Sequence, residues 1–101
     1  MGGLLENRLM QYQLYNIDAY SEVETDITST SVIIIRSTGS NNVAIFLVAY
    51  NFITLVNSTD SKNIGVEDSV IRIQVKSNGE GKAVFVNKTS VNIEIVVHII
   101  K

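Results

Sequence analysis

The chain has 101 residues, no cysteine, no proline and a net charge of −2, which fits one domain with a single thin core. Without cysteine it has no disulfides and no thiol-ligated metal, and its eight scattered Lys and Arg residues form no basic stripe for nucleic acid. Charged residues make up only 18% and hydrophobic residues 46%. Because a small domain of this composition often buries apolar surface against a partner, we expect a homo-oligomer.

The first sixteen residues form a lead segment, and residues 17–101 are expected to form the folded domain. Residues 4–14 fit a short helix, since Leu5, Leu9 and Tyr12 recur at helical spacing. They also fit a strand, because apolar residues alternate with glutamines over residues 10–14.

Charged residues interrupt the N-terminal segment at Glu6 and Arg8. A signal peptide needs an uninterrupted apolar stretch at that place, so we expect none.

Between Ile17 and Ile27, apolar and acidic residues alternate, which predicts a strand with one buried and one wet face. The acidic side chains are Asp18, Glu22, Glu24 and Asp26. Carboxylates bind hard cations, but side chains spaced along one strand do not converge. We therefore expect a solvated face and no metal site. The β-branched run Val32–Arg36 predicts the next strand.

The most apolar stretch is Val43–Val56, where only Asn51 and Thr54 are polar. It is too short to span a bilayer, which takes about 20 residues, and too long for one ordinary strand. We expect two core strands, over residues 43–49 and 52–57. Asn51 is the expected pivot because asparagine tolerates the left-handed conformation.

A hairpin is predicted over residues 70–87, with a glycine-containing turn at 77–81. Its first strand is expected to point Ile71, Ile73 and Val75 inward and Arg72, Gln74 and Lys76 outward. The turn NKTS and a last strand over 91–101 complete an all-β fold. This fold is an antiparallel β-sandwich or jelly roll of about six to eight strands, preceded by a short helix if residues 4–14 are helical.

The last strand is apolar on both faces in its C-terminal half. Its second face carries Val96, His98 and Ile100, whereas the outward face of a lone sandwich should stay polar. These three residues are therefore candidates for a subunit interface. The alternative is cover from a loop or from the N-terminal segment of the same chain.

No constellation of residues points to catalysis. His98 is the only histidine, and neither an orienting partner nor a nucleophile is recognisable for it. We expect a protein that is not an enzyme and holds no cofactor. Shallow glycan sites use exposed aromatics with polar loop residues, and Tyr20, Tyr50, Asn41 and Asn42 are the candidates for glycan contact.

The hairpin 70–87, the turn NKTS and the closing strand IEIVVHII together resemble the trimeric head domains of bacteriophage fibres. The resemblance covers residues 17–101 and rests on general character, without a diagnostic motif. It implies a virion-surface structural protein, made in the host cytoplasm, that assembles as a homotrimer and binds host glycans.

Two other classes of protein fit the sequence. One is a capsid decoration protein, which holds capsomers together and binds no sugar. The other is a monomeric bacterial carbohydrate-binding β-sandwich module, located in the cytoplasm or at the cell surface. None of these classes requires a membrane segment or a nucleic acid.

Overall fold

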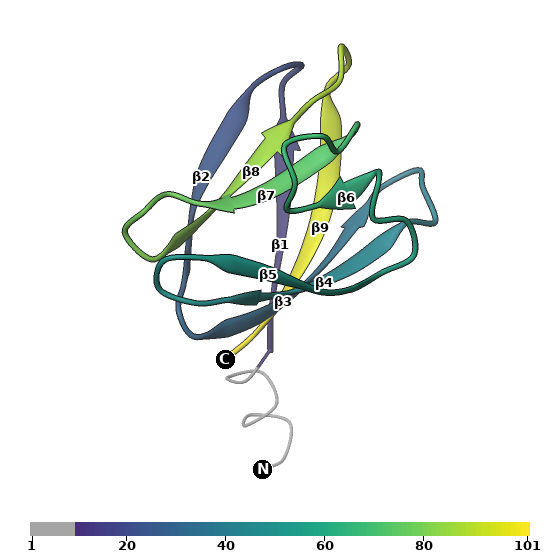
Figure 1. Ribbon diagram of the computed structural model, residues 1–101. Helices are drawn as coiled ribbons and strands as arrows, with labels where there is room; N and C mark the ends of the chain where they lie inside the picture. Colours follow the sequence, from purple (N-terminus) through teal and green to yellow (C-terminus); the bar gives the residue numbers. More distant parts are fainter. Residues whose placement is uncertain (1–9) are drawn as a thin grey trace.

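The computed structural model describes residues 10–101, which form nine β-strands in two sheets (Figure 1). This architecture confirms the predicted all-β sandwich, and its nine strands are one more than the upper end of the expected six to eight. The strands are β1 (Met10–Ile17), β2 (Glu22–Thr28), β3 (Ser31–Ser37), β4 (Val43–Val48), β5 (Ile53–Ser58), β6 (Ile64–Gly65), β7 (Ile73–Ser77), β8 (Lys82–Asn87) and β9 (Ile93–Ile100).

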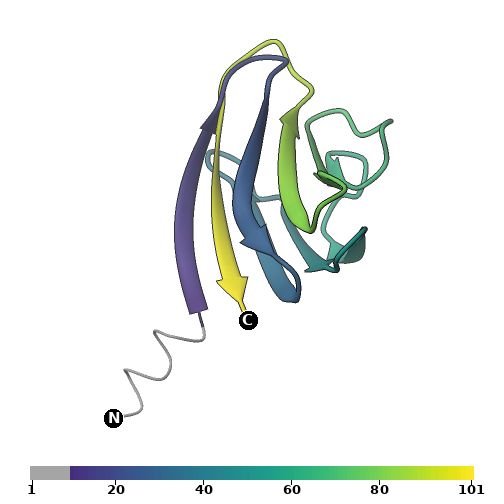
Figure 2. The same ribbon diagram turned by 90° about the vertical axis from the view of Figure 1, so that its left-hand side faces the viewer.

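The sheets form two layers (Figure 2). The five-stranded sheet has the order β1-β9-β3-β4-β5, and the four-stranded sheet has the order β2-β8-β7-β6. All pairs are antiparallel except β6 with β7. The last strand, β9, therefore lies between the first and third strands, one strand in from the β1 edge of its sheet.

The core lies between the layers and consists mainly of β-branched residues and two phenylalanines, Phe46 and Phe85. Tyr15 closes one side of the sandwich, with its ring edge-on to Phe85 at a centroid distance of 5.3 Å. Thr25 is a buried polar residue, and its hydroxyl donates a 2.8 Å hydrogen bond to the Ala83 carbonyl. Because its hydroxyl is hydrogen-bonded, this threonine can be buried on the inner face of β2.

The N-terminal half of the fold differs from two expectations. Residues 10–14 are strand rather than helix, because they pair with β9 from Met10↔Ile100 to Ile17↔Ile93; residues 4–9 lie outside the described residues. A turn at residues 18–21 also splits the expected strand Ile17–Ile27 into β1 and β2.

The apolar stretch Val43–Val56 does form two strands, β4 and β5, joined at residues 49–52. The expected left-handed pivot at Asn51 is wrong: in residues 10–101, Tyr20 is the only residue other than glycine with positive φ. The turn is closed instead by the Ala49 N–H, which donates to the Phe52 carbonyl at 3.0 Å.

The predicted hairpin is present as β7 and β8, but β7 begins three residues later than expected. Ile71 precedes the strand and is 64% exposed, so its inward placement was wrong, and Gln74 is buried instead of exposed. The Ile71 N–H donates to the Lys62 carbonyl at 2.8 Å, which holds this residue in a loop connection.

Candidate functional site

The three predicted interface residues lie on the outer face of β9, between β1 and β3. Val96 is only 2% exposed, although no described segment forms a layer above it. Its neighbours in register are Leu14 on β1 and Arg36 on β3, which cover it from both sides. The burial predicted for this position is therefore supplied within the sheet, and His98 and Ile100 remain half-buried.

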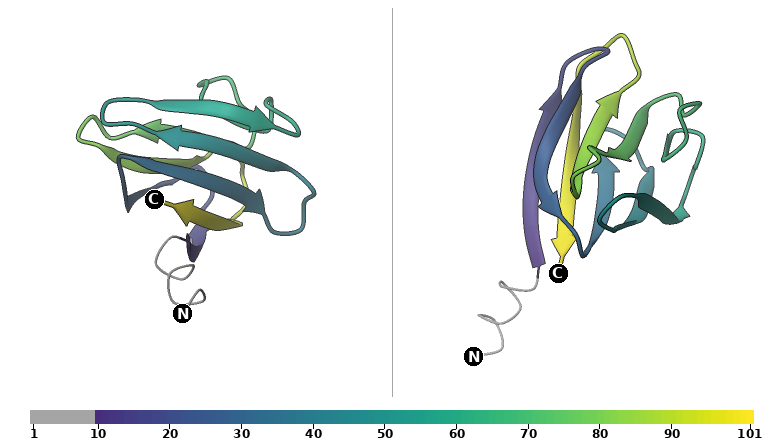
Figure 3. Two further views of the ribbon diagram at one scale, coloured as in Figure 1. Left: turned by 90° about the horizontal axis from the view of Figure 1, so that it is seen from below. Right: turned by 60° about the vertical axis from the view of Figure 1, so that its left-hand side comes forward.

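The outer face of the five-stranded sheet is mainly apolar, because the residues that face outward on each strand pair with outward-facing residues on the next. The left view of Figure 3 looks onto β3, β4 and β5 from this side, and no described segment lies in front of them. The apolar and aromatic members of the outer face, with its one histidine, are Tyr12, Leu14, Val32, Ile34, Val43, Ile45, Leu47, Val56, Val96, His98 and Ile100. Its polar members are Asn16, Arg36, Thr54, Asn57 and Glu94.

Charge is confined to one end of this outer face, where Arg36 lies beside Val96 and Glu94 lies two residues before it on β9. Five strands about 4.8 Å apart and about 20 Å long give a projected area on the order of 500 Å². The largest apolar patch of a typical monomer is roughly 300–600 Å², and patches of that size are often functional.

The four-stranded sheet has the opposite character on its outer face. Beside Val84 and Val86 of β8, its side chains there are mostly charged, and Lys76 pairs with Glu22 at 3.8 Å and Lys82 with Asp26 at 3.7 Å. This confirms the predicted wet face of β2. The two sheets of this chain therefore differ in the polarity of their outer faces.

An aromatic contact orders the middle of the apolar outer face. The rings of Tyr12 and His98 meet edge-to-face, with centroids 5.2 Å apart. They lie opposite each other on β1 and β9, and Ile34 flanks His98 on β3. Edge-to-face packing of this kind favours one arrangement of both rings, so each ring stabilises the orientation of the other on the outer face.

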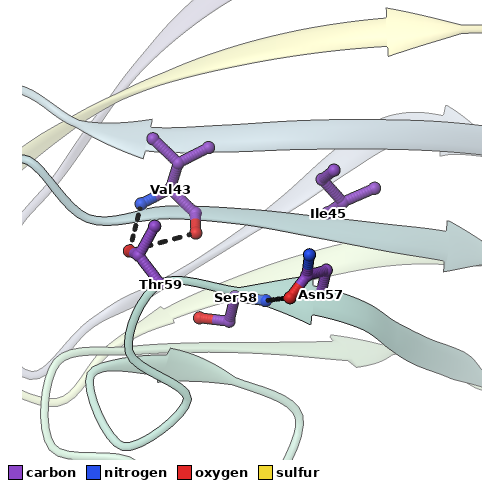
Figure 4. A pocket seen from close by; sticks show the side chains of 5 residues that line it. All are labelled: Val43, Ile45, Asn57, Ser58 and Thr59. Atoms are coloured by element: carbon purple, nitrogen blue, oxygen red, sulfur yellow. Dashed lines mark hydrogen bonds between the residues drawn. The ribbon is translucent and has the colours of Figure 1, made fainter.

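A shallow depression of about 280 Å³ lies at the β5 side of the outer face, lined by Val43, Ile45, Asn57, Ser58 and Thr59 (Figure 4). Its polar groups are engaged within the chain. The Thr59 hydroxyl accepts the Val43 N–H at 2.9 Å, and the Asn57 side-chain carbonyl accepts the Ser58 N–H at 2.8 Å. The depression thus offers a ligand mainly apolar contacts.

A second, polar depression of about 420 Å³ lies over β2 and β7 of the four-stranded sheet, where Glu22, Glu24 and Glu80 come together with Lys76. The Asn78 side-chain amide donates to the Glu24 carboxylate. Residues 10–101 contain no group of three or more His, Cys, Asp or Glu side chains arranged to hold a metal ion.

The four candidate glycan-contact residues lie at two ends of the sandwich. Tyr20 follows β1, and Asn41 and Asn42 follow β3; both strands run antiparallel to β9, so these loops share one end. Tyr50 lies at the other end, since it follows the reversed strand β4. Its ring lies so close to Gly81 that a Cβ there would be 3.2 Å away. One chain does not bring the four residues into one surface.

The sequence pattern does not indicate the role of one residue, Asn87, which joins several segments through hydrogen bonds. Its buried side-chain amide donates to the carbonyls of Ile17, Asp18 and Val91 at 3.0, 3.1 and 2.8 Å. Its carbonyl oxygen accepts from the Thr89 N–H at 2.9 Å and from the Thr89 hydroxyl at 2.8 Å. The motif NKTS predicts a turn, and only the tertiary structure shows that its asparagine also anchors the turn between β1 and β2.

Comparison of the chain with protein-family models, with curated proteins and with solved structures gave no match. No helix within residues 10–101 is both long and apolar enough to cross a membrane. Among the described residues, the mainly apolar outer face of the five-stranded sheet is the feature that best indicates a function.

Proposed function

We propose that the chain is a non-enzymatic structural subunit that assembles with copies of itself through the apolar outer face. The observation that carries the proposal is the pattern of that face: eleven of its outward positions, on five strands, are apolar or aromatic residues or the single histidine. The polar positions lie at one end of the sheet (Asn16, Arg36 and Glu94) or on the edge strand β5 (Thr54 and Asn57). An outward face of a solvated antiparallel sheet is ordinarily polar, as the four-stranded sheet of this same chain is.

A second copy is the occupant that the surface fits best. Burying apolar surface favours association by about 25 cal/mol for each Å² removed from water, before the costs of association. The outer face carries one cation and one anion at its end, Arg36 and Glu94, so two copies meet without net repulsion. In a homo-oligomer, the outer face of every chain is removed from water.

The finer proposal is a subunit at a virion surface, with three copies as in the phage fibre heads that the sequence resembles. In that arrangement, the end of the sandwich that carries Tyr20, Asn41 and Asn42 is the candidate glycan contact. A capsid decoration protein would use the same outer face on other capsid subunits. A monomeric carbohydrate-binding module would leave the face in water.

Light scattering coupled to gel filtration tests the assembly. Each chain has a mass of 11.1 kDa, and the proposal expects a particle of a whole multiple of that mass, threefold for the fibre-head reading. A particle of two copies would retain the face and overturn the trimer. A monomer at all concentrations would overturn the proposal.

Two matched substitutions locate the interface. Ile45→Lys places a charge in the middle of the apolar outer face, and Val86→Lys places one on the outer face of the four-stranded sheet; both side chains are half-buried. We expect the first variant to dissociate and the second to remain assembled, since a desolvated unpaired charge opposes association. Circular dichroism confirms that both fold. Equal behaviour of the two variants would show that the interface lies elsewhere.

A further inference from the structure

The two sheets have four edge strands, and three of them carry features that oppose pairing with another strand. β2 has Glu22, Glu24 and Asp26 facing solvent and an irregular register between Glu24 and Thr28. β5 has a bulge opposite Ile45 and Phe46, and β6 is two residues long. Charges, bulges and short length are the usual means by which proteins protect sheet edges.

The fourth edge strand, β1, has none of these features. Its eight residues, MQYQLYNI, contain no charge, glycine or proline, and its register with β9 is regular from end to end. Among the described residues, no strand pairs with its other edge. Its free edge therefore presents backbone N–H and C=O groups along the strand, and a further strand can pair with them.

We propose that β1 of one copy pairs antiparallel with β1 of a second copy around a two-fold axis, joining two five-stranded sheets into one of ten strands. The contact is self-complementary because the strand carries no charge that would face its own copy. The same arrangement at β2 would place Glu24 opposite Glu24, which is unfavourable.

The alternation of faces limits the register. In one continuous sheet, residues opposite each other must point to the same side, so the two residue numbers add to an even number. Placing Gln13 opposite Gln13 pairs Tyr12 with Leu14 of the second copy, twice, on the outer face. These side chains are 58% and 52% exposed in one chain, and such aromatic–aliphatic pairs stabilise neighbouring strands.

This contact goes beyond the proposed assembly and does not depend on it. The outer face buries side chains between layers, whereas the edge of β1 joins backbones within one layer. A chain that uses both has two separate interfaces, one on the face and one at the edge.

The absence of cysteine from the chain makes the edge directly testable by cross-linking. In the Gln13→Cys variant, the proposed register places two cysteines opposite each other, within about 5.5 Å, which a disulfide can bridge. In the control Gln11→Cys, on the same side of the same strand, the two cysteines lie about 14 Å apart along the strand. Both native side chains are exposed.

Under mild oxidation, we expect a disulfide-linked dimer from Gln13→Cys, at least tenfold faster than from Gln11→Cys, on a non-reducing gel. Equal rates, or no dimer from either variant, would overturn the pairing. A dimer from Gln11→Cys alone would overturn the register. Repeating the experiment with Ile45→Lys separates the two proposals, because edge cross-linking should persist when assembly through the outer face is lost.

Discussion

Single residues decide how the loops at one end of the sandwich are held. Asn87 is the clearest case, since its amide makes five hydrogen bonds that join β1, β8 and the turn before β9. Its backbone N–H also donates to the Ser21 carbonyl at 2.9 Å. Removing such a side chain leaves several buried partners unpaired, which costs more than the bonds themselves contribute.

We expect Asn87→Ala to lower the free energy of unfolding by about 3 kcal/mol, measured by urea denaturation at fixed protein concentration. The matched control is Asn57→Ala. Asn57 is an exposed asparagine, and Ser58 and Thr59 follow it in the sequence. It should change the unfolding free energy by less than about 0.5 kcal/mol. A similar loss of unfolding free energy in both variants would show that the hydrogen bonds of Asn87 contribute no more than those of an exposed asparagine.

Tyr15 provides the second residue-scale prediction. Burial raises the pKa of Tyr15 above its usual value, and the nearby Asp26 carboxylate raises it further. Because the folded state holds the phenolic proton more tightly than the unfolded state, this contribution to stability is complete below the unfolded pKa and is lost as the pH rises through the folded pKa. The loss therefore begins at about pH 10.

Tyr15→Phe removes the titrating group and retains the ring that packs on Phe85. We expect the variant to lose less stability than the unaltered chain between about pH 9 and pH 11, measured as the shift of the urea midpoint. The variant also loses the hydrogen bond from the Tyr15 hydroxyl to the Gln13 side-chain carbonyl, so the comparison is made between pH values within each protein. Parallel losses would contradict the prediction.

At the scale of the element, β3, β4 and the C-terminal half of β9 differ from ordinary surface strands because both of their faces are mainly apolar. The two apolar stretches noted in the sequence, at Val43–Val48 and at Val96–Ile100, place their outward halves on the same face. The run Val32–Ile35 on β3 lies between them. Sequence alternation predicts which residues share a side of one strand, but only the register shows that the sides join.

At the scale of the whole molecule, the two layers have unlike outer surfaces. The four-stranded sheet is mostly charged, with ion pairs across its strands, and the five-stranded sheet is mainly apolar. Such one-sided polarity is what a subunit needs in order to face water on one side and its copies on the other. The free edge of β1 adds a second direction in which the chain can be extended.

The sequence alone determined the class of fold and most of the strands. Alternation with a period of two in residues 17–27, 73–87 and 91–101, the glycine turn at 77–81 and the divided stretch Val43–Val56 are local signals, because side-chain direction along a strand depends only on neighbouring residues. The candidates Val96, His98 and Ile100 were found in the same way, from a break in that alternation.

Tertiary structure decided everything that depends on which strands are neighbours. Residues 10–16 became an edge strand because β9 returns beside them, and Tyr12 and Leu14 thereby extended the apolar outer face. Ile71 remained outside, because its backbone bonds to a loop rather than to β8. Strand order arises from contacts distant in sequence, whose energies no local pattern records.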